Sequence, residues 1–137
     1  VDLRVGFVRS DLVGAVLTLE VDRAFVAEAK PAAVQVVPCS DTDAYSMVER
    51  AGLRGAFADP QVGSAHLEGA EAETAIASVV QLLQRLSVLA ETVPEVAAVV
   101  LDPVIVSTRG AVVTDVRVRM DLLTPEERLP VRRLEAR

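Results

Sequence analysis

The chain has 137 residues, of which 51% are apolar and only 3% are aromatic, so Val, Leu and Ala must fill its interior. This length predicts one domain with a sizeable core. A formal net charge of −6 and a pI near 4.8 argue against nucleic acids and anionic membranes as partners, because both are negatively charged. The single cysteine, Cys39, excludes a disulfide framework and a zinc cluster.

No apolar run reaches the roughly 18 residues that a membrane-spanning helix needs, and no signal-peptide pattern opens the sequence. We therefore expect a cytoplasmic protein. The sequence begins at Val1, within an apparent strand, which suggests an excised domain or a processed chain.

The first third of the chain contains strand-like segments separated by turns. Runs of apolar and β-branched residues predict strands over residues 2–8, 14–21 and 33–37. Residues 24–27 either continue the second strand or form a strand of their own. The cluster SDTD at residues 40–43 is typical of a helix N-cap with an acidic first turn, and predicts a helix of about ten residues that ends near Gly52.

The central part of the chain predicts one long helix after a connection. Residues 53–70 contain Gly and Pro and predict a partly irregular segment. Over residues 71–92 apolar side chains recur at three- and four-residue steps, which predicts an amphipathic helix that Pro94 ends.

The distal third predicts a β-hairpin, because two apolar runs at residues 99–106 and 111–120 flank a turn that contains Gly110. Strands, a helix, a long helix and a hairpin together indicate an α+β fold with a mainly antiparallel sheet and two principal helices. We assign this domain to residues 1–120. Residues 121–137 are charged and contain prolines, which predicts a C-terminal arm.

Each strand of the predicted hairpin carries one aspartate among apolar residues, Asp102 and Asp115. Burying an unpaired carboxylate is costly, so each needs a partner, a set of hydrogen bonds or a metal. On paired strands the two can present oxygen ligands to a hard cation such as Mg²⁺. Alternatively, Asp102 caps backbone amides in an Asp-Pro turn, and Asp115 pairs with Arg109 or Arg117.

Several short motifs follow one another along almost the whole chain. They are DLRVGF at residues 2–7, RSDLVG at 9–14, FVAE at 25–28, RG at 54–55, LSVLAE at 86–91, PEV at 94–96, LDPV at 101–104 and TDVRV at 114–118. In this order they resemble the C-terminal half of the ATP-grasp domain of NDP-forming acyl-CoA synthetases. The same domain occurs in protein acetyltransferases that are fused to a GNAT domain.

The resemblance implies ATP and Mg²⁺ as cofactors. Asp102 and Asp115 match the family's two metal-ligand positions, an Asn and an Asp. Asp2 matches a Glu on the family's first strand, and Arg54 matches the Arg of its R-G loop, so both are candidate nucleotide contacts. For Arg54 the alternative is an exposed loop arginine with a structural role.

The sequence also departs from the family pattern. Asp2 is one methylene shorter than the family's Glu, residues 22–23 replace a glycine pair, and Ala27 replaces a Glu. Asp102 in place of Asn adds a negative charge beside Asp115. These departures predict a degenerate ATP-grasp domain.

Two other residues could carry chemistry. His66 is the only histidine and could act as a general base or be phosphorylated, because histidine side chains in general can exchange a proton near neutral pH, although nothing around it resembles a histidine-loop motif. Cys39 is either a half-buried small apolar residue or a reactive thiol.

Two functional hypotheses follow. In the first, the chain contributes Mg-nucleotide binding to acyl-CoA formation and is inactive alone. Its partners are then the CoA-binding domain and the N-terminal ATP-grasp half of a longer polypeptide. In the second, it is a non-catalytic regulatory or scaffold module of a GNAT-fused protein lysine acetyltransferase. A weaker third possibility is homo-oligomerisation through apolar surface that a missing half would cover.

Overall fold

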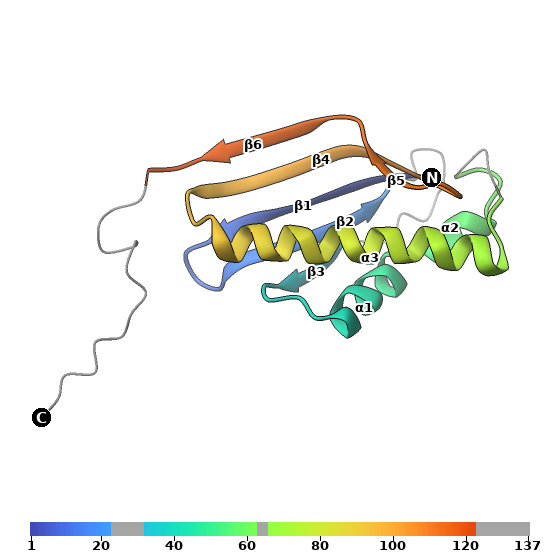
Figure 1. Cartoon of the computed structure of the whole chain (residues 1–137), viewed down its shortest axis with the longest axis horizontal. Coiled ribbons are helices and arrows are strands. Elements are labelled where there is room, and N and C mark those ends of the chain that lie inside the picture. The colour runs from blue at the N-terminus through green and yellow to red at the C-terminus, as the bar shows by residue number, and fades with distance from the viewer. Residues whose placement is uncertain (23–31, 63–65, 123–137) are drawn as a thin grey trace, which may run out of the picture.

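The computed structural model describes residues 1–22, 32–62 and 66–122 (Figure 1). Six strands form one antiparallel sheet in the order β3-β2-β1-β4-β5, and β6 also pairs with β4. The strands are β1 (Asp2–Ser10), β2 (Gly14–Val21), β3 (Ala33–Val36), β4 (Val96–Ser107), β5 (Gly110–Val113) and β6 (Val116–Met120). The 12-residue β4 pairs with β6 over its first half and with β5 over its second half.

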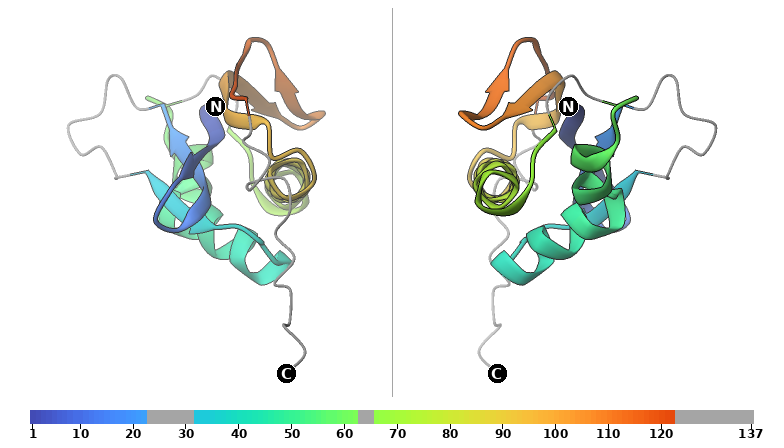
Figure 2. Two further views of the ribbon diagram at one scale, coloured as in Figure 1. Left: turned by 90° about the vertical axis from the view of Figure 1, so that its left-hand side faces the viewer. Right: turned by 90° about the vertical axis from the view of Figure 1, so that its right-hand side faces the viewer.

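Three helices lie on one side of this sheet: α1 (Asp41–Ala51), α2 (Leu53–Ala58) and α3 (Gly69–Thr92). The view along α3 in Figure 2 shows this helix beside the blue strands β1 and β2 and below the orange strands, with α1 packed near it. None of the helices in the described ranges is long and apolar enough to cross a membrane. The α+β class and the antiparallel sheet predicted from the sequence are confirmed.

Apolar and polar side chains alternate along the strands, and the helices cover the face of the sheet that carries the apolar ones. On β1 the side chains of Leu3, Val5 and Phe7 are buried, and they share one core with Ile76 and Leu83 of α3. Burying each such side chain contributes about 1.5–3 kcal/mol. Asp2 and Arg4 alternate with these residues, and their exposed side chains project from the opposite, open face of the sheet.

Helix α1 begins and ends as its sequence predicts. The Ser40 side chain accepts a hydrogen bond from the Asp43 backbone N–H, and the Asp43 carboxylate accepts one from the Ser40 N–H, which completes a capping box. Gly52 ends the helix at φ 72°, a left-handed conformation that favours glycine.

The segment predicted to be partly irregular after Gly52 contains the short helix α2 at residues 53–58, which the sequence did not indicate. The physical reason is burial, because Leu53, Ala56 and Phe57 enter the core on one face of that helix. The two principal helices that the sequence predicts are α1 and α3, and α2 is a short third helix.

The predicted hairpin forms, but its second strand is divided into β5 and β6 at Thr114-Asp115. Pro103 has no N–H to offer a sheet ladder, and its carbonyl instead accepts bonds from both the N–H and the hydroxyl of Thr114. The possible strand at residues 24–27 and the C-terminal arm beyond Leu122 lie outside the described residues.

Candidate functional site

A β-bulge marks the place where β1 passes the middle of β4. Leu3 pairs with Val104 and Val5 pairs with Leu101, so Asp102 and Pro103 together face the single residue Arg4. Such a bulge changes the direction in which a strand presents its side chains. Here it brings Asp102 to Arg4 on the open face.

Arg4 and Asp102 form the best-aligned ion pair of this region. Nε and Nη2 of Arg4 lie 2.8 and 2.7 Å from the same carboxylate oxygen, Oδ2 of Asp102. The side chain of Arg4 is 59% exposed and that of Asp102 is 29% exposed. The hydrogen bond to Asp102 and its charge, together with the weaker fields of Glu20 and Asp22, raise the pKa of Arg4 above its ordinary value.

A small hollow surrounds this pair. It has a volume of about 120 Å³ and is lined by Arg4, Glu20, Asp22 and Asp102. Glu20 lies directly across from Arg4 in the β1–β2 register. Three carboxylates thus surround the single guanidinium of Arg4. The net charge of the hollow is negative, and it attracts the guanidinium.

Asp115 lies next to Asp102 on the neighbouring strand, since the Asp102 N–H donates to the Asp115 carbonyl at 3.2 Å. Its Oδ1 accepts a bond from the Val116 N–H at 3.0 Å, and its Oδ2 is 3.9 Å from Nε of Arg117. The predicted alternative of a pair with Arg117 is therefore present, as a long contact of a side chain that is 58% exposed.

The two aspartates supply donor chemistry that suits Mg²⁺, which is commonly held by one or two carboxylates together with phosphate oxygens. Within the described residues, no cluster of three or more His, Cys, Asp or Glu side chains forms a complete metal site. Asp102 and Asp115 would therefore fit a cation shared with a phosphate ligand, provided that Asp102 releases Arg4.

The other two predicted site residues lie apart from each other. Asp2 is exposed on β1, two residues before Arg4 and hence on the same open face. Arg54 lies on α2 in the helical layer, where it pairs with Glu49 at 3.3 Å and with Glu73. These carboxylates raise the pKa of Arg54. The structure therefore places Asp2, and not Arg54, on the face that carries Asp102.

His66 and Cys39 have ordinary partners. His66 is exposed and its Nε2 lies 2.7 Å from Oε1 of Glu68. The Cys39 backbone N–H donates to Oγ of Ser87 at 2.9 Å. Partial burial, together with the nearby aspartates of α1, raises the pKa of the Cys39 thiol, which disfavours the nucleophilic thiolate.

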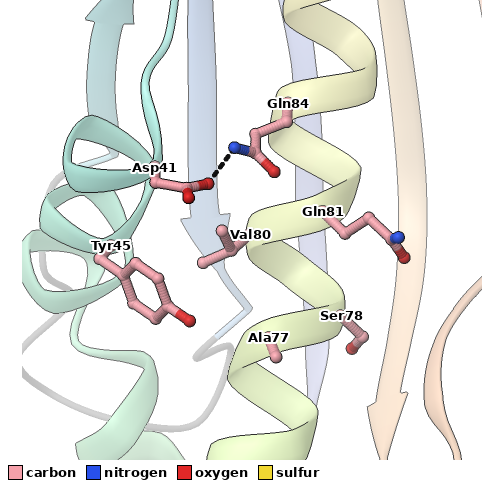
Figure 3. A pocket seen from close by; sticks show the side chains of 7 residues that line it. All are labelled: Asp41, Tyr45, Ala77, Ser78, Val80, Gln81 and Gln84. Carbon is pink, nitrogen blue, oxygen red and sulfur yellow. Dashed lines mark hydrogen bonds between the residues drawn. The ribbon is translucent and has the colours of Figure 1, made fainter.

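A separate groove of about 430 Å³ lies between α1 and α3 (Figure 3). Tyr45 borders it, and the Gln84 amide donates to the Asp41 carboxylate across it. None of the residues predicted as site residues lines this groove. The open-face corner around Asp102 is therefore the candidate site.

The sequence analysis missed Arg4 as the partner of Asp102. A usable signal was present, because an arginine alternates with the apolar residues Leu3 and Val5 in the DLRVGF strand. What the sequence lacked was the register that brings together two residues 98 positions apart.

Comparison with known proteins identifies the class to which this fold belongs. Residues 1–120 match the family model of an ATP-grasp domain, and the chain belongs to that family. The resemblance stated from the motifs is therefore confirmed. No curated protein sequence shows significant similarity to the chain.

Three solved structures have a similar fold. A dinucleotide-forming acetyl-coenzyme A synthetase 1 from Ca. Korarchaeum cryptofilum is 24% identical, with a TM-score of 0.70, over 87% of this chain and 48% of that chain. A form of that enzyme in complex with coenzyme A and Mg-AMPPCP is 22% identical, with a TM-score of 0.69, over 88% and 53% of the two chains. The protein PH1788 from Pyrococcus horikoshii is 22% identical, with a TM-score of 0.68, over 88% and 48%. The chain spans about half the length of these relatives.

Proposed function

We propose that this chain is the C-terminal half of the ATP-grasp domain of a protein like the NDP-forming acyl-CoA synthetases, and that it forms one wall of a Mg-nucleotide site. The single observation that carries the proposal is the position of Arg4, Asp102 and Asp115. The bulge of β4 and the break between β5 and β6 bring these charged groups to one corner of the open sheet face.

The chemistry of this corner suits a nucleotide polyphosphate. A guanidinium binds phosphate oxygens in a bidentate manner, and carboxylates bind the cation that accompanies them. Phosphoryl transfer depends mainly on positioning and on neutralisation of phosphate charge, which Mg²⁺ supplies when bound. One of the similar enzymes was solved with Mg-AMPPCP and coenzyme A, which supports this class of ligand.

Exposed apolar side chains on the open face also support the proposal that a second ATP-grasp half packs there. Val8 of β1 and Val34 and Val36 of β3 are 43%, 51% and 47% exposed on the open face, away from the charged corner. Similar proteins are about twice as long. We propose that the N-terminal ATP-grasp half covers these valines and completes the nucleotide site, with a CoA-binding domain in the same cytoplasmic polypeptide. The chain alone is then inactive. No comparison supports the alternative of a GNAT-fused acetyltransferase module.

Calorimetric titration of Mg-ATP tests the proposal, first with the full chain and then with the longer polypeptide that carries it. We expect binding by the longer polypeptide, and at least tenfold weaker binding after Asp115→Asn, because a ligand to a shared cation is worth more than about 1.4 kcal/mol. Glu91→Gln is the matched control, since it removes one exposed carboxylate from α3. No heat with the longer polypeptide, or an equal effect of the two substitutions, contradicts the proposal.

A further inference from the structure

The geometry points to Arg4 as the resident cation of this site: its guanidinium neutralises Asp102 and keeps a divalent ion from that carboxylate until a phosphate ligand draws the guanidinium away. This inference deepens the proposed function, because it states how the same corner selects its ligands. It concerns the coupling between the two ligands, in which a bound polyphosphate strengthens the binding of the metal.

The first step of the argument is direct competition for one oxygen. Both Nε and Nη2 of Arg4 donate to Oδ2 of Asp102, at 2.8 and 2.7 Å. Mg²⁺ requires a ligand oxygen at about 2.0–2.1 Å and repels a guanidinium at contact distance. Asp102 therefore cannot bind the ion with that oxygen while Arg4 remains in place.

The second step is that a change of pH cannot remove Arg4. An arginine stays charged throughout the physiological range, and the surrounding carboxylates of Asp102, Glu20 and Asp22 stabilise that charge further. Release then needs a competing anion. A polyphosphate is such an anion, because it offers planar pairs of oxygens to the fork of the guanidinium.

The third step is the contrast with Asp115. Its side chain is 58% exposed, and its nearest arginine nitrogen is 3.9 Å away, at Arg117. A divalent ion without nucleotide therefore meets one accessible carboxylate and one that is neutralised. With a polyphosphate bound to Arg4, the Asp102 carboxylate also becomes available to a cation, so metal and nucleotide bind with positive coupling.

Titration of Mn²⁺ alone into the full chain tests the inference. Binding is followed by paramagnetic broadening of the amide signals of residues 101, 102, 104 and 114–116. Arg4→Gln keeps part of the side-chain stem and removes the charge. We expect it to bind Mn²⁺ roughly three- to tenfold more tightly than the wild type, in line with the loss of an exposed ion pair and of a like charge. The double variant Arg4→Gln, Asp102→Asn should lose this gain.

Arg85→Gln provides the matched control, because it makes the same change in net charge on α3. Circular dichroism establishes that each variant is folded. Equal Mn²⁺ affinity of Arg4→Gln and Arg85→Gln, no measurable binding by Arg4→Gln, or a gain that survives Asp102→Asn would overturn the inference. Because no nucleotide is used, these outcomes are independent of whether the longer polypeptide binds Mg-ATP.

Discussion

Arg9 joins the end of β1 to the C-terminal end of α3, where its Nη2 donates to the carbonyl oxygen of Ala90 at 2.9 Å. The same guanidinium contacts the carbonyls of Val93 and Val96, at 3.4 and 3.0 Å from Nη2. The last carbonyls of a helix have no partner within the helix, and a cation is favoured at that end of its dipole. One side chain thus satisfies the helix end and fixes the turn into β4.

Arg9→Ala should lower the free energy of unfolding by about 1–3 kcal/mol, because it leaves several partly buried carbonyls without a donor. Urea denaturation followed by circular dichroism measures this loss. Arg9→Lys keeps the charge but not the planar donors. Its free energy of unfolding should therefore lie between those of the wild type and Arg9→Ala. Arg85→Ala on the exposed side of α3 is the control, and a loss as large as that of Arg9→Ala would refute this role for Arg9.

Gly6→Ala should be far more damaging than its size suggests. A Cβ at Gly6 would lie 2.1 Å from the backbone oxygen of Val99, so β1 and β4 would have to separate locally. We expect a loss of more than about 2 kcal/mol, beyond that of typical substitutions. Gly55→Ala in α2 meets no atom within 4 Å and should instead stabilise the chain by about 0.5–1 kcal/mol. Similar melting temperatures for the two variants would contradict the close approach of the β1 backbone at Gly6 to the β4 backbone at Val99.

The capping box of α1 predicts a dependence of stability on pH. Hydrogen bonds from the backbone and side chain of Ser40 lower the pKa of Asp43 in the folded chain. The stabilisation is therefore fully present above about pH 4, the pKa of an unfolded aspartate. It is lost as the pH falls through the lower folded value. Asp43→Asn should thus destabilise the chain at pH 7, and less so at pH 2. Urea titrations at both pH values measure this, and an equal loss at each would rule the linkage out.

Cys39 should react slowly with alkylating reagents at neutral pH. Partial burial and the nearby carboxylates of Asp43 and Asp41 raise its pKa, which reduces the thiolate fraction. Alkylation by iodoacetamide at pH 7, followed by mass spectrometry, should be several-fold slower in the folded chain than in urea. A folded-state rate equal to or above the unfolded rate would mean that the thiol is activated.

Local signals in the sequence predicted most of the fold. Apolar periodicity predicted α3 to within two residues at its start, and the cluster at residues 40–43 placed the start of α1. Helix α2 was missed because six residues are too few to show a period, and burial of Phe57 outweighs the glycine at position 55. The motifs led to the ATP-grasp family, which the family comparison confirmed.

The candidate site was predictable only in part. Asp102 and Asp115 were singled out as an adjacent pair, and their backbones do hydrogen-bond to each other. The ion pair between Arg4 and Asp102 depends on a bulge that no local pattern reveals. The roles of Asp2, Arg54, Asp102 and Asp115 toward nucleotide and metal stay predictions.

Along β4 the backbone holds the sheet together while the side chains form the candidate site, and this separation affects how the corner can evolve. Backbone bonds to β1, β5 and β6 hold the strand around residue 102, and none of those bonds uses the Asp102 carboxylate. Side chains at the junction can therefore be exchanged while the sheet stays intact. In a scaffold of this kind, substitutions can replace a bound metal by an arginine, or abolish the function of the site, without changing the fold.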